Sequence, residues 1–392
     1  MTRSCADAAI TGIGMSRIGR KTQQPALLLL ADAALEAIAD AGLTRDDIDG
    51  ICTYPGRMDA SPGMSPLGVG EVRNALGIET TWHAGIPEGA AQMAPLMVAA
   101  MAVATGHARH VLCFRALTES SSQSAGRRAS VPTGTSSRVG GWFSWYLPMN
   151  AVSATNWAGW MATRYMHEFG LTREHLGLLA VNQRNNALKN PRALMRTPLG
   201  MDEYRAARII SSPLCLFDCD IPIDGACAFI VSSAEAVRDC AKPPLRIAAF
   251  GAGMRSKESW DQRPDLTTMA AHDAAADMWR RTDLKPRDID VLALYDGFSI
   301  FLPIWLEAFG FCGHGEAKDF IADGNTRLDG RFPLNTGGGQ LSAGRLHGFG
   351  LLHELCLQLR GEGGDRQVPG ARIGVCGMGG GPLAGAMLVA GD

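Results

Sequence analysis

The sequence has no two cysteines at the CxxC spacing and no CxxC…HxxxH pattern, although it contains ten cysteines. Structural zinc sites use those spacings, so no metal site is expected. The opening stretch "MTRSCADAAITGIG" also lacks the apolar core of a secretory signal. The scattered cysteines are therefore expected to be reduced thiols of a cytoplasmic protein.

A surplus of either charge is missing as well, because the formal net charge is only -2. Binding to nucleic acid or to a membrane surface is therefore not expected. The segment "GAAQMAPLMVAAMAVATG" (89–106) carries no charge over a length that could span a bilayer. Its many small residues, together with Gln92 and Pro95, instead favour a helix packed on all sides inside a soluble protein.

Two segments of the chain align with each other without a gap: "DAALEAIADAGLTRDDIDGICTY" (32–54) and "DAAADMWRRTDLKPRDIDVLALY" (273–295). Each predicts an amphipathic helix, a polar turn and a strand that begins at Asp-Ile-Asp and ends in a tyrosine, Tyr54 or Tyr295. Two looser matches follow in the same order, "TGIGMSR" with "AFGAGMR" and "ARHVLCF" with "ARIGVCG". The chain is therefore expected to contain two similar α/β halves.

The predicted first half covers 1–114 and resumes over 213–241, and the second half covers 242–392. Between them lies an inserted loop domain, 115–212. Its start is rich in Ser, Gly and Arg, and it becomes helical around "NWAGWMATRYMHEFGLTREHLGLLAVNQRNNAL". The Pro-Pro of "KPPLRIAAFGAG" marks the start of the second half.

These motifs resemble the thiolase superfamily. "NTGGGQLSAGRLHGFG" (335–350) resembles the thiolase Asn-x-x-Gly-Gly…Gly-His-Pro-x-Gly loop, and "VCGMGGGPLAGAMLVA" resembles the C-terminal Cys-x-Gly-Gly-Gly turn. "DGACAFIVSSAEA" resembles the strand that ends the first half, and "YDGFS" stands where thiolases carry Asn-Glu-Ala-Phe. "RYMHEFGLTREHLGLLAVNQRNNALKNPRAL" and "LEAFGFCGHGEAKDF" are similar to the lipid-transfer or sterol-carrier type branch, which includes thiolases and steroid side-chain aldolases.

The resemblance implies an α/β fold of five layers, α-β-α-β-α, with two mixed five-stranded sheets around buried helices. It also implies a homodimer formed along the edge of the first-half sheet. The expected substrate is an acyl-CoA thioester, with no further cofactor. Members of this branch often work with a zinc-ribbon and OB-fold partner, which here would have to be another chain.

The departures from the thiolase pattern decide the expected chemistry. In "HAGIPEGAAQ" Ile86 falls where thiolases have their nucleophilic cysteine, so no acyl-enzyme is expected at that position. We expect an enzyme that makes or breaks a C–C bond next to the thioester, by retro-aldol or thiolase-type chemistry. The alternatives are a thiolase that uses Cys113 or Cys376, and a non-catalytic acyl-CoA or lipid carrier or partner subunit. The sequence does not specify the acyl chain.

One candidate group lies on a turn of the first half, and another ends the repeated segment in the second half. The turn before Gly89 opens a helix, whose free N–H groups can stabilise a thioester oxyanion. Glu88 on that turn is either a general base or an ordinary first-turn glutamate that binds N–H groups. Tyr295 either donates to a carbonyl oxygen or accepts a β-hydroxyl proton, or it packs like its repeat mate Tyr54.

The glycine-rich loops supply the other candidates. His347 either protonates an enolate or orients a water, or it is a surface loop histidine. Arg345 stands where the aldolase branch tends to have a second tyrosine. It either binds an acidic or enolate group or forms a salt bridge across the dimer. Cys376 is either the acid/base that thiolases use at the α-carbon or a buried small side chain like its repeat mate Cys113.

The glycines are expected to let a narrow thioester tunnel run between backbones, and the candidate substrate-binding residues are Gly89, Gly338, Gly339, Gly379 and Gly380. The aromatic segment 142–161 is a candidate for a partner surface, a ligand tunnel or the insertion's own small core.

Overall fold

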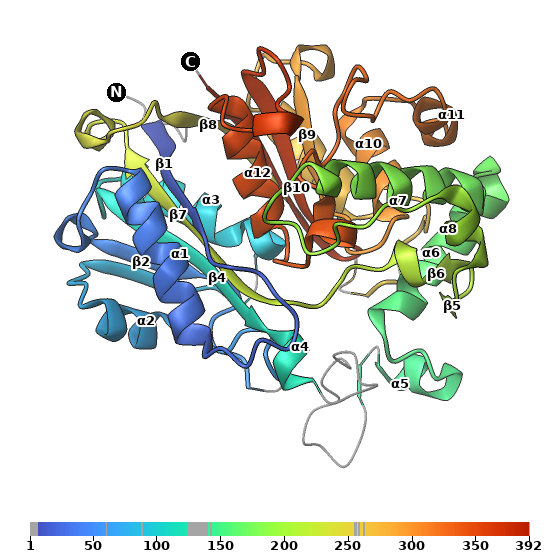
Figure 1. The fold of residues 1–392 in the computed structure, drawn as a ribbon, viewed down its shortest axis with the longest axis horizontal. Helices are drawn as coiled ribbons and strands as arrows, with labels where there is room; N and C mark the ends of the chain where they lie inside the picture. Colours follow the sequence, from blue (N-terminus) through green and yellow to red (C-terminus); the bar gives the residue numbers. More distant parts are fainter. Residues whose placement is uncertain are drawn as a thin grey trace.

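A computed structural model describes residues 7–59, 61–87, 89–123, 140–141, 143–254, 257, 259–261 and 263–391. Its main sheet has nine strands in the order β3-β2-β4-β7-β1-β8-β11-β10-β9. The first-half strands are β1 Ala8–Met15, β2 Gly50–Thr53, β3 Trp82–Gly85, β4 His110–Thr118 and β7 Asp224–Ser233. The second-half strands are β8 Leu245–Gly253, β9 Val291–Leu294, β10 Ile373–Gly380 and β11 Leu383–Ala390. Both halves are visible side by side in Figure 1.

The halves repeat each other, as the internal alignment predicts. Strands β2 and β4 pair in parallel, as β9 and β10 do, and β4–β7 and β10–β11 are the matching antiparallel pairs. The two copies meet where Ala9 and Ile10 of β1 pair with Arg246 and Leu245 of β8. The Asp-Ile-Asp triplet begins no strand in either copy, because it ends a short 3-10 turn before the strand starts. Its second aspartate caps a neighbouring strand instead: Asp290 accepts the amide of Ile373, and Asp49 accepts the amide of His110.

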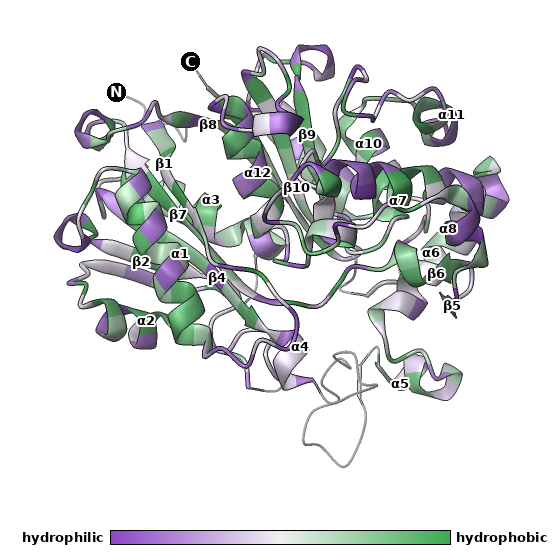
Figure 2. Cartoon of the chain, in the orientation of Figure 1, coloured by the Kyte–Doolittle hydropathy of each residue, from purple (hydrophilic) through white to green (hydrophobic). Residues whose placement is uncertain are grey.

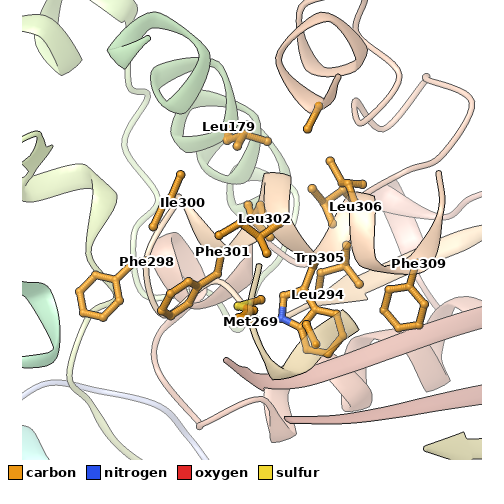
Figure 3. Packing of buried hydrophobic residues seen from close by; sticks show 14 of the residues in the cluster. Leu179, Met269, Leu294, Phe298, Ile300, Phe301, Leu302, Trp305, Leu306 and Phe309 are labelled. Carbon is orange, nitrogen blue, oxygen red and sulfur yellow. The ribbon is translucent and has the colours of Figure 1, made fainter. Parts of the chain in front are cut away.

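Three hydrophobic clusters separate five layers. The first-half helices are α1 Ala26–Asp40, α2 Val69–Leu76, α3 Ala94–Ala104 and α4 Glu119–Ser122, and the second-half helices are α9 Ala270–Trp279, α10 Phe301–Phe309, α11 Ala317–Ala322 and α12 Phe349–Leu359. Helices α1 and α2 cover the outer face of the first sheet, α3 and α12 fill the middle layer, and α9 and α10 cover the second sheet. Figure 3 shows buried side chains of α10 in this core, among them Phe301, Trp305 and Phe309. The predicted layering is therefore confirmed.

The prediction of two separate five-stranded sheets is wrong in two respects. Strands β1 and β8 pair and join the halves into one nine-stranded sheet, and the second half contributes only four strands among the described residues. The chain beside β9 forms a single bridge, Leu292 with Leu334. Asn335 then turns away with a φ of 48°, and its side chain exchanges two hydrogen bonds of 2.8 Å with the backbone of Leu294. An amide side chain thus replaces the next strand residue, so the fifth strand does not form.

The charge-free segment forms a 3-10 turn, Ala91–Met93, and then α3. Eight residues of α3 are buried, although Met101 is 47% exposed, so the helix is not enclosed on every side. Among the described residues, no helix combines the length and the apolar character that crossing a bilayer requires.

The insertion carries α5 Phe143–Tyr146, α6 Ala154–Phe169, α7 Arg173–Leu188, α8 Met201–Ala206 and the short strands β5 Ile209–Ser211 and β6 Leu214–Cys215. Strand β4 continues to Thr118, beyond the predicted boundary at 114. Helix α7 carries both hydrophilic and hydrophobic stretches in Figure 2, although much of it is buried. Its amides explain this, because Asn182, Asn186 and Asn190 just beyond its end bind backbone carbonyls of the segment 326–337. The insertion thereby holds the glycine-rich loop in place.

Candidate active site

The candidate active site lies where strands from both halves end. Tyr54 follows β2, Glu119 follows β4, and Tyr295 follows β9. In α/β sheets the carboxyl ends of parallel strands are the usual place for ligand binding. The loop that carries Arg345 and His347 reaches the same region, so residues distant in sequence form one buried polar cluster.

Arg345 is held by two carboxylates of its own chain. Its NH2 group donates to Glu119 Oε2 at 2.6 Å, and its NH1 group lies 3.5 Å from Asp220 Oδ2. Burial lowers the pKa of the guanidinium, but Asp220 and Glu119 outweigh burial and raise it above its usual value. The predicted salt bridge therefore exists within one chain rather than across a dimer, and it occupies the groups that would bind an acidic substrate.

His347 is 3% exposed, which excludes the surface-loop alternative. Its Nδ1 accepts a hydrogen bond of 2.8 Å from Arg115 NH2, so the proton of the neutral ring lies on Nε2, 3.7 Å from Glu119 Oε2. Burial, Arg115 and Arg345 together lower its pKa well below the usual value. The ring is neutral near pH 7 and connects Arg115 to Glu119, which suits positioning better than proton transfer.

Tyr295 carries the phenol of the cluster. Its backbone N–H donates to Gly377 O at 2.9 Å, and its ring stacks on Phe301 with 6.4 Å between centroids. Burial and the nearby carboxylate of Asp220 raise the pKa of the phenol, with Arg345 opposing them. A neutral phenol donates a hydrogen bond, so Tyr295 suits polarisation of a carbonyl or contact with a hydroxyl more than proton abstraction. Its repeat mate Tyr54 contributes its backbone oxygen, which accepts from Arg115 NH1 at 2.5 Å.

A cavity of about 690 Å³ opens beside this cluster. Its wall includes Asp220, Cys219 and Leu341 near the cluster and four cationic side chains: Arg20, Lys21, Arg184 and Arg208. The volume is in the range of small-molecule sites, and Asp220 joins the cavity to Arg345. The arrangement can therefore bring a negatively charged ligand to a buried set of polar groups.

Known proteins are similar to this chain in sequence and in fold. A family model described as "Thiolase C-terminal domain-like" matches residues 252–390. The chain is 37% identical over 362 residues to the 17-hydroxy-3-oxo-4-pregnene-20-carboxyl-CoA lyase of Mycobacterium tuberculosis, covering 90% of this chain and 92% of the relative. It is 36% identical over 365 residues to a steroid side-chain-cleaving aldolase of Thermomonospora curvata, covering 90% of each. The chain belongs to the thiolase superfamily.

A solved structure described as an Ltp2-ChsH2(DUF35) aldolase superimposes on this thiolase-superfamily chain with a TM-score of 0.89. The two are 32% identical, and the match covers 99% of this chain and 98% of the other. These likenesses confirm the resemblance to the lipid-transfer type branch that the sequence motifs indicate.

Ile86, which the sequence resemblance puts at the position of the thiolase nucleophile, donates its backbone N–H to Thr53 O at 3.0 Å. Gly89 nearby is exposed, with a φ of 157°. Glu88, the candidate base of this turn, lies outside the described residues, so its role stays a prediction. Helix α3 begins only at Ala94, after the 3-10 turn.

Cys376 lies on β10 in the apolar middle layer and is fully buried. Burial raises the pKa of its thiol well above the usual value, and the same holds for Cys113. The Sγ atom of Cys113 faces the carbonyl oxygen of Pro95 at 3.6 Å. Both environments favour small buried side chains over reactive thiolates. The proposed acid/base role of Cys376 stays a prediction.

The glycines of the two loops allow other atoms to come close to their backbone, and the atoms that do so belong to the protein itself. A Cβ on Gly339 would lie 1.9 Å from Asp296 Oδ2, and one on Gly338 would lie 2.6 Å from the Cβ of Ala187. Burial raises the pKa of Asp296 to about 7, and its carboxyl accepts the amide of Gln340 at 2.9 Å. In the other loop, a Cβ on Gly379 would meet Ala91 at 2.6 Å, and one on Gly380 would meet the Met269 sulfur at 3.2 Å. The thioester tunnel between these loops stays a prediction.

Sequence reasoning missed three charged members of the cluster: Arg115, Glu119 and Asp220. A signal for Arg115 was present, because "HVLCFRALT" places one charged residue inside an apolar strand. The predicted strand stopped at residue 114, one position before Arg115 and four before the observed end at Thr118. Glu119 and Asp220 lie in segments that the sequence marks only as polar, and their partners are more than 100 positions away.

The aromatic segment supplies a small core, as one of its three interpretations proposed. Tyr146 and Trp157 are buried, and Phe143, Trp160 and Trp260 pack against them. Trp142 lies outside the described residues. Trp145 and Met149, at 66% and 60% exposure, remain on the surface beside this core. The segment therefore also presents apolar side chains to solvent.

Proposed function

We propose that this protein cleaves the Cα–Cβ bond of a β-hydroxyacyl-CoA thioester by a retro-aldol reaction. The proposal is carried by Tyr295, a half-buried tyrosine whose phenol is kept neutral by a raised pKa, together with Ile86, which the sequence resemblance puts at the position of the thiolase nucleophile. The likeness to two enzymes named as a CoA lyase and a steroid side-chain-cleaving aldolase supports it. The acyl chain is proposed to be bulky, as in those relatives.

A retro-aldol cleavage needs no covalent acyl-enzyme. It requires a hydrogen-bond donor for charge that develops on the thioester oxygen and a base for the β-hydroxyl proton. Tyr295 is proposed as a donor, and the positive charge of Arg345 lies close enough to it to affect its pKa. His347 and Arg115 are proposed to keep this arrangement rigid, since each is buried and they bind each other.

The cavity rim is proposed to bind the phosphates of coenzyme A. Arg20, Lys21 and Arg208 are exposed cations on its wall, and they can attract an anion from solvent. Arg184 is different, because its Nε donates to Ser342 Oγ at 3.0 Å and it is 2% exposed. We expect Arg208→Ala to raise KM for acyl-CoA and to leave kcat nearly unchanged, whereas Arg238→Ala, which lies outside the cavity wall, should alter neither.

A partner subunit is proposed as well. The structural neighbour is described by the name of a two-component Ltp2-ChsH2(DUF35) aldolase, which supports a partner here. We propose a separate chain with a zinc ribbon and an OB fold. The exposed Trp145 and Met149 are its proposed contact. Trp145→Ser should reduce co-purification with such a partner, whereas Leu28→Ser, on the outer face of α1, should not.

A homodimer is the proposed assembly of this chain, through strand β3 (Trp82–Gly85) at the edge of the sheet. Two β3 strands could pair across a two-fold axis. Light scattering that gives the mass of a single chain at micromolar concentration would contradict this assembly.

One observation favours a second candidate, thiolase-type acyl transfer through a different thiol. Cys219 lies on the cavity wall next to Asp220, whereas the expected alternatives Cys113 and Cys376 are buried away from the cavity. A thiol at this place could reach a thioester. It would be recognised by an acyl adduct on Cys219.

The deciding experiment incubates the protein, alone and with a co-expressed partner, with panels of β-hydroxyacyl-CoA and β-ketoacyl-CoA thioesters. Mass spectrometry then detects shortened acyl-CoA and the released carbonyl compound. Cleavage of β-hydroxyacyl-CoA without added free CoA supports the aldolase. Cleavage of β-ketoacyl-CoA that requires free CoA supports the thiolase. Tight binding with no turnover under either pairing supports an acyl-CoA carrier.

A further inference from the structure

One carboxylate of the buried cluster also forms part of the cavity wall. Asp220 belongs to the wall, whereas Glu119, Tyr295, Arg345 and His347 do not. Asp220 is 3% exposed, so the small part of its side chain that a ligand can reach is the part that faces the cavity. Of the two carboxylates on Arg345, it is therefore the one that a bound substrate can touch.

The backbone around Asp220 fixes this position from two sides. Its N–H donates to Gly297 O at 3.1 Å, which ties it to the turn after Tyr295. The next residue, Ile221, accepts the amide of Arg345 at 2.9 Å and donates to Gln340 O at 3.3 Å. The turn after Tyr295 and the 340–345 loop thus hold the backbone of Asp220 in place, with its carboxylate 3.5 Å from Arg345 NH1. Such support is what a reacting group needs for a fixed geometry.

Among the described members of the cluster, the other polar groups do not suit the removal of a hydroxyl proton. The Tyr295 phenol is neutral, and Arg345 and Arg115 are donors only. The one acceptor nitrogen of His347 is occupied by Arg115. Glu119 Oε2 accepts from Arg345 at the shorter distance of 2.6 Å, and Glu119, unlike Asp220, does not line the cavity.

We infer that Asp220 is a catalytic residue, the general base that takes the β-hydroxyl proton of the substrate. This inference rests on the proposed retro-aldol function. The carboxylate accepts the proton, and the O–H electron pair forms the new C=O bond. The Cα–Cβ bond breaks, and its electrons form the enolate of the shortened acyl-CoA. A proton returns to Cα, so the substrate divides into a carbonyl compound and an acyl-CoA with no net change in protons.

The test compares Asp220→Asn with Glu119→Gln, since each removes one carboxylate from Arg345. Asp220→Asn is expected to lower kcat by about 10²–10⁴-fold with KM within about threefold of wild type. Glu119→Gln should lower kcat at least about tenfold less, because Glu119 does not line the cavity. Equal losses in the two variants would overturn the inference and assign Asp220 to charge balance only.

Chemical rescue separates a base from a charge partner. In Asp220→Ala, acetate should restore turnover more strongly than the weaker base fluoroacetate, because general-base rates follow basicity. Equal rescue by both anions, or none, would overturn the inference. If the single variants do not fold, the charge-neutral pair Asp220→Asn with Arg345→Gln is compared with Arg345→Gln alone. The pair should be at least about tenfold slower.

Wild-type turnover keeps the two proposals apart. A wild-type protein that cleaves no β-hydroxyacyl-CoA, alone or with its partner, overturns the proposed function. Wild-type cleavage together with an active Asp220→Asn variant, retaining more than about a tenth of kcat, overturns only the assignment of Asp220.

Discussion

The guanidinium of Arg115 donates to Nδ1 of His347 across 2.8 Å, although 232 positions separate the two residues in sequence. This bond fixes the tautomer of the imidazole and makes His347 an acceptor for Arg115. It also joins a strand of the first half to the glycine-rich loop of the second. The pair therefore decides what His347 can do in the reaction.

Replacing His347 by Asn is expected to preserve most of the activity. An Asn side chain can place an amide oxygen near the position of Nδ1, and Asn tolerates the left-handed backbone that His347 adopts at a φ of 50°. We expect kcat within about fivefold of wild type for His347→Asn. His347→Ala leaves Arg115 without its acceptor and should lose stability by about 1–3 kcal/mol. Steady-state kinetics and denaturant unfolding measure both.

The same pair predicts the shape of the pH profile. The pKa of His347 is lowered well below its usual value, so its protonation should produce no change in rate between pH 6 and 8. Two results together would show that His347 is an acid or base instead. The wild-type profile would change near pH 6.5 and this change would be absent in His347→Asn, and kcat of the variant would fall by two orders of magnitude or more.

Tyr295 and Tyr54 form a matched pair for testing the phenol. Both end the repeated segment, but Tyr54 contributes its backbone carbonyl to the cluster. Tyr295→Phe should lower kcat by about 10²–10⁴-fold and leave the Kd for acyl-CoA nearly unchanged. Tyr54→Phe should change kcat by no more than about twofold, because the carbonyl is retained. Similar losses in both variants would show that the phenols serve packing rather than chemistry.

The repeat made most of the fold predictable. Helix–turn–strand units that align without a gap must fold alike, so β2 and β9 and the layers around them followed from periodicity. The absence of a fifth strand in the second half could not be predicted in this way, because that absence depends on a single residue. Asn335 turns the chain at a positive φ and hydrogen-bonds Leu294 through its side chain. Local propensity does not contain that tertiary contact.

The candidate site was predictable where a motif marked it and not where tertiary contacts made it. Tyr295, Arg345 and His347 stand in recognisable motifs, and the structure brings them together with Asp220. Glu119 and Asp220 have no local pattern, since their role comes from a charge supplied by Arg345 more than 100 positions away. A buried cation such as Arg345 requires a counter-charge, which predicts that carboxylates exist nearby but not which ones.

The thiol at the cavity wall gives a test between aldolase and thiolase. A retro-aldol reaction needs no thiolate, so Cys219→Ser should retain kcat within about twofold of wild type. Cys240→Ser, at a half-buried position away from the cavity wall, is the matched control. Loss of activity by two orders of magnitude in Cys219→Ser alone, with an acyl adduct on Cys219 in the wild-type protein, would establish the acyl-transfer mechanism.

The last prediction concerns the contact between the two halves. Asp40, at the end of α1, lies 2.6 Å from Arg360 NH1 and 2.6 Å from Lys242 Nζ, and it accepts the amide of Ile13 at 2.9 Å. The Arg360 side chain is 2% exposed. Asp40→Asn would leave that cation without its carboxylate, so the free energy of unfolding should fall by about 3–5 kcal/mol at pH 7. Glu168→Gln, in a surface pair, should cost less than about 1 kcal/mol.

The size of this loss should depend on pH in a defined direction. Burial raises the pKa of Asp40, but hydrogen bonds from Lys242, Ile13 and Arg360 outweigh it, and the pKa of the folded state is lowered. The unfolded chain then binds the proton more readily near the usual aspartate pKa of about 3.9. The stabilisation is therefore complete above that value and is lost as the pH falls through the folded-state pKa. Urea unfolding from pH 7 to pH 3 should show the gap between wild type and Asp40→Asn narrowing below about pH 4. A gap that stays constant over this range would mean that the Asp40 charge contributes nothing to the contact between the halves.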